Sequence, residues 1–240
     1  FIKTLGALSV SPLISANQLS QIKLVSDDLP KIDNDSELWK TIRSHYTLKE
    51  DYINLESGYY NIIPNPILEH LIKHVKHVNV EGSYYMRNEL KKNKNRVISE
   101  LAELVGSTSD QIGITRNATE SLDLVISGFQ WKKGDEAIYA KQDYGSMKEM
   151  FEQISSRYGV KNKIVSVPNH PKNDEEIVSI YENQITDKTK LIMVCHMINI
   201  TGQILPIKKI CEMAHRYGVE VMVDGAHCVG HFDFSIDDFN

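Results

Sequence analysis

Predicted strands and helices alternate along most of the chain, as the spacing of its apolar residues indicates. Short, almost wholly apolar runs predict buried strands, and apolar residues at every third or fourth position predict helices. The predicted strands are 111–115, 136–140, 164–167, 191–195 and 219–223. The helices predicted between them are 118–129, 146–158, 174–185 and 206–217. Such alternation is typical of α/β folds, in which a mainly parallel sheet carries helices on both faces, in three layers.

The N-terminal part of the chain has a different pattern. Residues 1–16 are mildly apolar and end in small residues, and residues 17–50 are polar and predict a linker with a short helix at 37–45. Longer helices are predicted at 64–80 and 85–105. We therefore divide the chain into a signal-peptide remnant (1–16), a linker with a short helix (17–50) and a large domain (51–240).

The start of the chain bears on localisation. Phe1-Ile2-Lys3 before the apolar run resembles the end of a twin-arginine signal whose arginines are not in the sequence. This resemblance predicts a protein exported to the periplasm, and a cytoplasmic protein with a disordered leader is the alternative. No run is long and apolar enough to predict a membrane span.

Composition narrows the class of protein. The chain is 41% hydrophobic and 25% charged, which is ordinary for a globular domain. A net charge of −5 argues against nucleic acid as a partner, because phosphate backbones are bound by clustered Lys and Arg. Cys195, Cys211 and Cys228 have no CxxC spacing and predict neither a disulfide framework nor a zinc knuckle. Each is expected to pack as a small buried hydrophobe.

The start of the helix predicted at 118–129 is a candidate phosphate site. Ligands of parallel sheets bind beyond the carboxyl ends of the strands, and this helix follows a predicted strand. Asn117 is a good N-cap, and Glu120 would complete a capping box. The free N–H groups and partial positive charge of a helix start bind phosphate, and Thr119 adds a hydroxyl. The alternative role is a helix cap and nothing more.

Three further strand ends carry residues suited to a planar cofactor. Tyr144 offers a ring that can lie flat on a ligand. Asn199 can donate to a phenolate oxygen, and Asp224 ends the last predicted strand, where a carboxylate can keep a pyridine nitrogen protonated. Core packing, a loop turn and a turn cap are the ordinary alternatives for these residue types.

Four motifs at these strand ends occur together in one known family. They are Thr-Arg-Asn-Ala-Thr-Glu at 115–120, Tyr-Gly at 144–145, Asn-x-Thr-Gly at 199–202 and Asp-Gly-Ala-His at 224–227. In this order they resemble the class V aminotransferase family of pyridoxal-5′-phosphate (PLP) enzymes. The resemblance covers roughly residues 52–240 and is greatest to the isopenicillin-N epimerase-like branch, with cysteine desulfurases as relatives.

The resemblance implies the large domain of a fold type I PLP enzyme and a set of cofactor contacts. Ala118 and Thr119 are expected to bind the phosphate, and Tyr144 to stack on the pyridine ring. Asp224 is expected to pair with the ring nitrogen and His227 to lie near the ring 3-oxygen, and these two are the implied catalytic residues. The implied cofactor-binding residues are Asn117, Ala118, Thr119, Tyr144, Asn199, Asp224 and His227.

The family's Schiff-base lysine is not among these residues. It is expected after Asp224 and a further strand, and no lysine occurs in 225–240. The chain is therefore interpreted as the N-terminal part of a longer enzyme, truncated before the small C-terminal domain and inactive by itself. The whole enzyme is expected to be a homodimer that acts at Cα of an amino-acid substrate, as an epimerase, aminotransferase or lyase.

Other interpretations stay open. A cysteine desulfurase would carry its catalytic cysteine beyond this region, and Cys228 is expected to be the only cysteine beside the site. A non-catalytic binding module would keep the fold without the chemistry. A nicotinamide-binding domain lacks its G-x-G-x-x-G turn here. A zinc pair at His227 and His231 lacks an evident third ligand.

Overall fold

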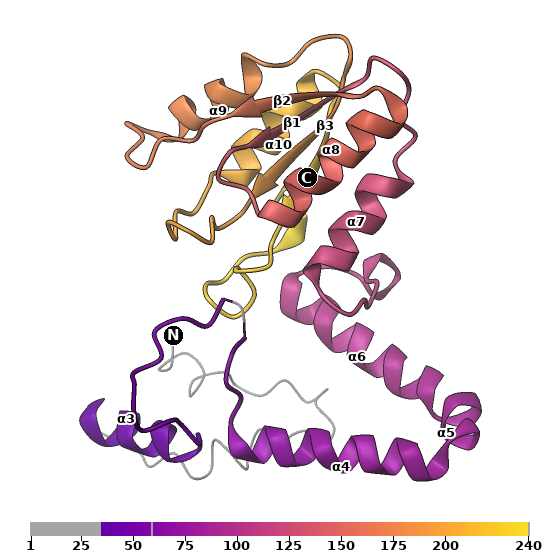
Figure 1. Ribbon diagram of the computed structural model, residues 1–240, viewed down its shortest axis with the longest axis vertical. Coiled ribbons are helices and arrows are strands. Elements are labelled where there is room, and N and C mark those ends of the chain that lie inside the picture. Colours follow the sequence, from indigo (N-terminus) through magenta and orange to yellow (C-terminus); the bar gives the residue numbers. More distant parts are fainter. Residues whose placement is uncertain (1–34, 59, 240) are drawn as a thin grey trace. The chain divides into compact units, whose positions relative to one another are not determined.

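The computed structural model describes residues 35–58 and 60–239, and the chain divides into two compact units, Phe1–Lys92 and Asn93–Asn240 (Figure 1). The predicted signal at 1–16 and much of the predicted linker lie outside the described residues, and the predicted domain boundaries stay predictions. Among the described residues, no helix is long and apolar enough to cross a membrane.

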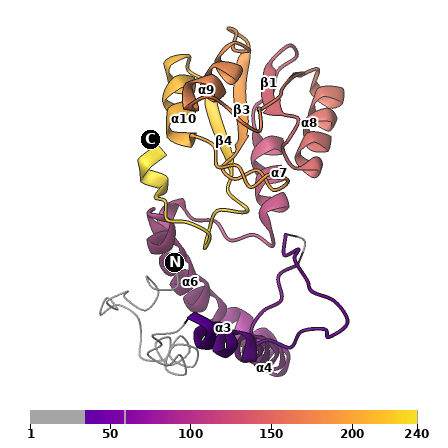
Figure 2. The same cartoon turned by 90° about the vertical axis from the view of Figure 1, so that its left-hand side faces the viewer.

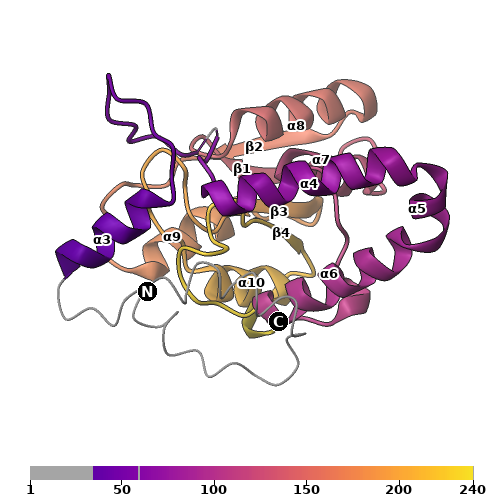
Figure 3. The same cartoon turned by 90° about the horizontal axis from the view of Figure 1, so that it is seen from below.

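Helices and an irregular stretch between Ser44 and Asn65 make up the described part of the first unit. Helix α3 spans Asp35–Ser44, α4 spans Asn65–Glu81 and α5 spans Ser83–Asn88. Gly82, with a φ of 53°, stands between α4 and α5, and Figure 3 shows the chain turning there.

The single helix predicted at 85–105 is wrong in one respect. It is broken at Glu89 into α5 and a second helix, α6, which spans Leu90–Val105. The amide of Asn88 donates to the carbonyl of Tyr84 at 2.9 Å. Side-chain bonds of this kind compete with the helical backbone pattern, which accounts for a break that apolar spacing does not show.

A four-stranded parallel sheet forms the centre of the second unit. Its strands are β1 (Glu136–Ala140), β2 (Lys161–Val165), β3 (Thr189–Cys195) and β4 (Glu220–Asp224), in the spatial order β2-β1-β3-β4. Because all neighbours are parallel, the carboxyl ends of the strands share one edge of the sheet. Strand β2 begins three residues before its predicted start at 164, since β2 pairs with β1 over the whole length of β1.

The strand predicted at 111–115 does not form. A short 3-10 helix, η1 (Ser109–Gln111), is followed by irregular chain up to α7. Gly113 lies in the middle of this run, and a glycine weakens a strand interior because it brings no side chain to pack. The phosphate-site candidate at 115–120 therefore follows a loop.

Helices cover both faces of the sheet, so the predicted three-layer α/β fold is confirmed. Helices α7 (Ala118–Gly128) and α8 (Gly145–Tyr158) lie on one face, and α9 (Asp174–Glu182) and α10 (Ile207–Arg216) lie on the other (Figure 2). Successive residues of a strand point to opposite faces. Accordingly Tyr139 packs with Phe151 of α8, while Ile138 belongs to the cluster around α9 and α10.

An aromatic cluster around His196 fixes the segment after β4. The rings of Phe232, Phe234 and Phe239 surround the ring of His196, with centroids 5.0–5.3 Å from it. Burial lowers the pKa of His196, so the imidazole is neutral among these rings. The cluster holds the chain that follows Asp224 beside the end of β3.

Candidate cofactor-binding site

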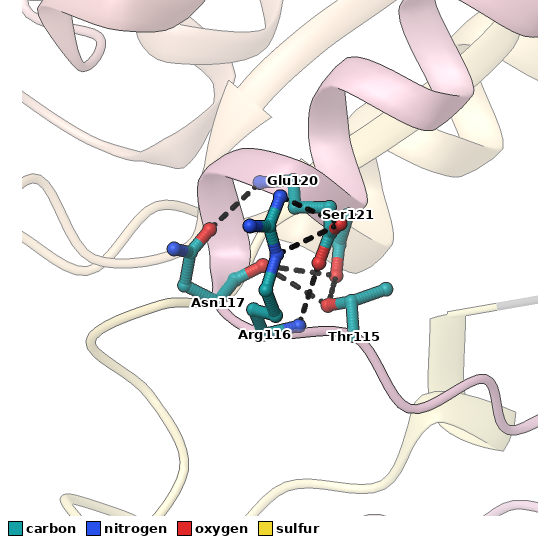
Figure 4. A network of polar contacts seen from close by, with 5 residues as sticks. All are labelled: Thr115, Arg116, Asn117, Glu120 and Ser121. Carbon is teal, nitrogen blue, oxygen red and sulfur yellow. Dashed lines mark hydrogen bonds and ion pairs between the residues drawn. The ribbon is translucent and has the colours of Figure 1, made fainter.

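The start of α7 is built as a capped helix terminus (Figure 4). Oδ1 of Asn117 accepts the backbone N–H of Glu120 at 2.9 Å, which confirms Asn117 as the N-cap. The Glu120 carboxylate accepts the backbone N–H of Arg116 at 2.7 Å. This differs by one residue from the usual capping box, in which the bond returns to the N-cap itself. Two bonds thus fix the turn into the helix.

The charge of Glu120 is balanced locally. The Arg116 guanidinium lies 3.1 Å from Oε1 of Glu120, and its hydrogen bonds hold the pKa of this carboxyl below its usual value. A second pair of contacts, between the hydroxyls of Thr115 and Ser121 at 2.6 Å and from Thr115 to the carbonyl of Asn117 at 3.0 Å, fixes the loop (Figure 4). The acidic residue nearest the helix start is therefore paired with a cation.

Two backbone donors remain available at this terminus. The first N–H groups of a helix have no partner within it. Among the described residues, nothing accepts from the N–H of Ala118 or Thr119, and the Thr119 hydroxyl makes no hydrogen bond. A hollow of about 310 Å³ lies beside this part of α7. It is lined by Arg116, Asn117, Thr119, Glu120, Asp123, Leu124 and Ser127. These donors at the positive end of a helix are the set that a phosphate group needs.

Asp224 lies at the carboxyl end of β4 and is 7% exposed. Its Oδ1 accepts the backbone N–H of Ala226 at 3.0 Å, so the ordinary role of a turn cap is present. Its Oδ2 lies 3.9 Å from the sulfur of Cys195, the residue paired with it in register on β3. One oxygen thus fixes the turn, and the other faces the neighbouring strand end.

Asp143 is a buried carboxyl that the sequence analysis missed. It is 3% exposed, and its Oδ2 accepts the backbone N–H of Ala140 at 2.7 Å. Burial raises the pKa of Asp143 to about 6, and the charge of Asp224 adds to the rise. A carboxylate three residues after a fully buried strand and directly before Tyr144 was the available signal.

The prediction that Cys228 is the only cysteine beside the site is wrong. Cys195 lies between the two carboxyls, because its strand pairs with β1 on one side and with β4 on the other. Burial, together with the charges of Asp143 and Asp224, raises the pKa of Cys195 far above its usual value. Cys228 is fully buried, and burial raises its pKa to about 11, as expected of a packed thiol. All three cysteines are buried, as predicted.

Three predicted residues remain, and each follows the carboxyl end of a strand. They are Tyr144, Asn199 and His227. Tyr144 precedes α8 and is 40% exposed as a residue, and its backbone lies against the Cys195 thiol. Asn199 is exposed in the turn after β3, and His227 is half-buried in the turn after β4. Among the described residues, neither of these two side chains makes a hydrogen bond, and Tyr144 and Asp224 do not line the hollow at α7.

The described residues contain no group of three or more His, Cys, Asp or Glu that could hold a metal ion. The groups present are of the kinds that bind an anionic, planar ligand. They are free N–H groups and a hydroxyl at one helix start, an exposed aromatic ring, and a carboxylate oxygen beside a protonated thiol. The buried Oδ1 of Asp143, which has no partner among the described residues, adds an acceptor near that carboxylate.

Comparisons with known proteins identify the family of this chain. The family model "Aminotransferase class-V" matches residues 61–240. Isopenicillin N epimerase of Streptomyces clavuligerus is 25% identical over 198 residues, which are 82% of this chain and 50% of that protein. A probable cysteine desulfurase of Methanothermobacter thermautotrophicus is 23% identical, over 81% of this chain and 48% of that protein.

Solved structures show the same fold. A C-DES mutant with glycine covalently linked to its PLP cofactor has a TM-score of 0.72 at 23% identity, over 82% of this chain and 53% of that one. The cysteine desulfurase CsdA of Escherichia coli has a TM-score of 0.69 at 20% identity, over 87% and 53%. The chain spans about half the length of these proteins. With three quarters of its residues matched by the family model, the chain belongs to the class V aminotransferase family, whose members use pyridoxal phosphate.

Proposed function

We propose that this chain supplies the cofactor-binding half of a PLP enzyme that acts at Cα of an amino-acid substrate. The observations that carry the proposal are the free donors at the start of α7, a helix that covers one face of the sheet, and the buried carboxylate of Asp224 at the carboxyl end of β4. Bound PLP supplies an electron sink for negative charge that develops at Cα.

The phosphate contacts would come from the first turn of α7. The N–H groups of Ala118 and Thr119 and the Thr119 hydroxyl are the donors, and the ion pair of Arg116 with Glu120 removes the nearest repulsive charge. Helix α9 makes a useful contrast. Its cap, Asn173, bonds to Glu176 as Asn117 bonds to Glu120, but its first turn is acidic at three positions. Asp174 and Glu175 share one cation, Lys209, so this turn keeps a net negative charge.

The ring contacts would come from three strand ends. Asp224 pairs with the ring nitrogen through the carboxylate oxygen that the Ala226 N–H does not engage. The buried Cys195 thiol stays protonated and contributes no competing charge. Tyr144 supplies an exposed ring for stacking, and Asn199 and His227 are assigned to the 3-oxygen. These roles rest on the residue types and on the resemblance to the family.

The rest of the chemistry belongs to the whole protein. Residues 225–240 contain no lysine, and we assign the Schiff-base role to a lysine outside this sequence. Epimerase-type chemistry is the first choice, because isopenicillin N epimerases are among the relatives. Probable cysteine desulfurases among them support a desulfurase or lyase as the alternative. A non-catalytic binding module is the outcome if the whole protein lacks that lysine.

We also propose a homodimer and export to the periplasm. What supports the dimer is α4, a helix without a buried residue, on which Leu71 and Val75 are 53% and 61% exposed. What supports export is the apolar run at 1–16. Sedimentation of the full-length protein and fractionation of cells that express it from its own start codon test these two points.

Titration of the full-length protein with PLP, and separately with pyridoxal, tests the proposed function. Wild type should bind PLP more tightly, because pyridoxal lacks the phosphate. The substitution Thr119→Glu should weaken PLP binding about tenfold, since charge effects at a helix start are on the order of 1 kcal/mol. The same substitution should leave pyridoxal binding unchanged, and Thr119→Ser should behave as wild type. Equal loss for both ligands, or no PLP binding at all, contradicts the proposal.

A further inference from the structure

Asp143 is buried in a position where a carboxyl is costly. Its Oδ2 accepts one backbone N–H, from Ala140, and its Oδ1 is buried without a partner among the described residues. A buried charged group needs hydrogen bonds or an opposite charge to offset its loss of solvation. Besides the Ala140 N–H, the thiol and backbone N–H of Cys195 act to lower the pKa of Asp143, but these neutral donors do not offset the effect of its burial.

The groups around Asp143 offer it no positive charge. The titratable groups with which it interacts are Cys195 of β3, Asp224 of β4, Tyr139 of β1 and Tyr181 of α9. None of these groups is a cation, and the charge of Asp224 opposes ionisation of Asp143. Two carboxyls that share such a region do not both ionise readily.

A cationic ring nitrogen at Asp224 would supply the missing positive charge. We propose that Asp143 is a positioning residue of the cofactor site, which closes the turn before Tyr144 and gives up its proton to solvent when a cationic ring pairs with Asp224. This inference rests on the proposed function and extends it to a residue to which the family resemblance assigned no role. Asp143 accepts the N–H of Ala140 and directly precedes Tyr144, the residue before α8, so this bond ties the backbone of Tyr144 to the end of β1.

The proposal predicts a pH dependence with a definite sign. If binding of the ring favours the carboxylate form of Asp143, then binding releases a proton and affinity rises with pH. Since the pKa of Asp143 without a ligand is about 6, the rise should occur mainly between pH 5 and about 6.5 and level off above that. Across this range the affinity should change about tenfold for each pH unit over which one whole proton is released.

The experiment uses the full-length protein and pyridoxine 5′-phosphate, which has no aldehyde and so cannot bond to a lysine. Dissociation constants are measured by calorimetry from pH 5 to pH 8 for wild type and for Asp143→Asn. The ratio of the two constants at each pH removes the ligand's own titration. Asn keeps an oxygen for the Ala140 N–H but carries no proton to release. Relative to this variant, wild type should lose about tenfold in affinity from pH 7 to pH 5.

Two further variants separate the roles. Asp135 is a matched control, since it lies at the other end of β1 and its Oδ2 likewise accepts the N–H of the residue three before it, Lys132, at 2.8 Å. Asp135→Asn should keep the pH dependence of wild type. Asp143→Ala removes the turn bond as well as the charge, and should weaken binding at every pH.

Infrared difference spectra of wild type provide a measurement that needs no variant. The band of a buried protonated carboxyl should be present at pH 5.5 and should disappear when pyridoxine 5′-phosphate is added. A wild type and Asp143→Asn with the same pH dependence, or a carboxyl band that survives binding, overturns this inference alone. Failure of wild type to bind the probe overturns the proposed function and this inference with it.

Discussion

The sulfur of Cys195 lies 3.9 Å from Oδ2 of Asp224, at the ends of two strands that pair in register. Burial and two neighbouring carboxyls keep this thiol protonated, so it serves as a weak donor and not as a nucleophile. Cys211 and Cys228 are buried as well, and burial raises the pKa of each. We therefore expect none of the three thiols to react with an alkylating reagent at pH 8 in the folded protein.

Mass spectrometry of peptides after alkylation of native and of unfolded protein checks this point. All three cysteines should be labelled after unfolding, and none within the same time before it. Rapid labelling of Cys195 in the native protein would show that the end of β3 is open to solvent, contrary to the structure.

The caps of α7 and α9 allow a paired test of local stability and ligand binding. Asn117 and Asn173 make equivalent bonds, to Glu120 and Glu176, at 2.9 and 3.0 Å. Replacement of either by Ala should lower the free energy of unfolding by about 1 kcal/mol. Only Asn117→Ala should also weaken PLP binding, because only the α7 terminus is proposed to hold the phosphate. Chemical denaturation and PLP titration measure the two effects, and equal loss of binding in both variants contradicts the assignment.

Asp143 should make stability depend on pH in an unusual direction. Its pKa is raised from 3.8 to about 6, so the stability associated with its proton is present below about pH 4 and is lost as pH rises through 6. Asp143→Asn removes the cost of a buried charge and should stabilise the protein without cofactor at pH 7.5, by on the order of 1–3 kcal/mol. The gain should vanish towards pH 4.

Glu136 is the opposite control for this pH dependence. Its carboxyl lies 2.8 Å from the ammonium of Lys163, and although burial acts to raise its pKa, bonds from Lys163 and Thr186 hold the pKa below its usual value. The contribution of the Glu136 carboxylate to the stability of the folded protein is present above its usual pKa and is lost as pH falls. Glu136→Gln should therefore destabilise the protein at pH 7.5 and have a smaller effect at low pH. Thermal unfolding of Asp143→Asn and Glu136→Gln at several pH values measures both effects. Changes in stability of the same sign for the two variants at pH 7.5 would be inconsistent with the structure.

Gly106 and Gly218 test the attachment of the segment after β4. Both have a positive φ, 63° and 68°, which an alanine adopts only with strain. A Cβ at Gly106 would also overlap the side chain of Ser235, whereas one at Gly218 meets nothing within 4 Å. We expect Gly218→Ala to cost about 1 kcal/mol and Gly106→Ala about 2–4 kcal/mol. Equal losses on chemical denaturation would mean that Ser235 does not pack against Gly106.

Much of the sheet could be predicted from the sequence because its strands are continuous apolar runs. The strands at 136–140 and 191–195 lie within two residues of their predicted bounds, and so does the helix predicted at 146–158, which ends before Gly159. The cap at Asn117 was predicted from residue type alone, because a side-chain oxygen before a helix has few other uses. Local chemistry was sufficient in each of these places.

What the sequence did not show depends on contacts between distant segments. The run at 111–115 has strand-like residues but no neighbouring strand among the described residues to pair with it. Cys195 and Asp143 look like ordinary packing and turn residues until the order β2-β1-β3-β4 brings their strand ends beside Asp224. Strand order is set by the packing of the whole sheet, which residue spacing does not encode.

A crystal structure of the full-length protein with PLP bound decides whether the start of α7 and Asp224 hold the cofactor. We expect the phosphate within hydrogen-bond distance of the backbone N–H groups of Ala118 and Thr119, and the ring nitrogen within hydrogen-bond distance of the Asp224 carboxylate. A phosphate bound away from the start of α7, or a ring nitrogen that faces no carboxylate, would contradict the proposed function.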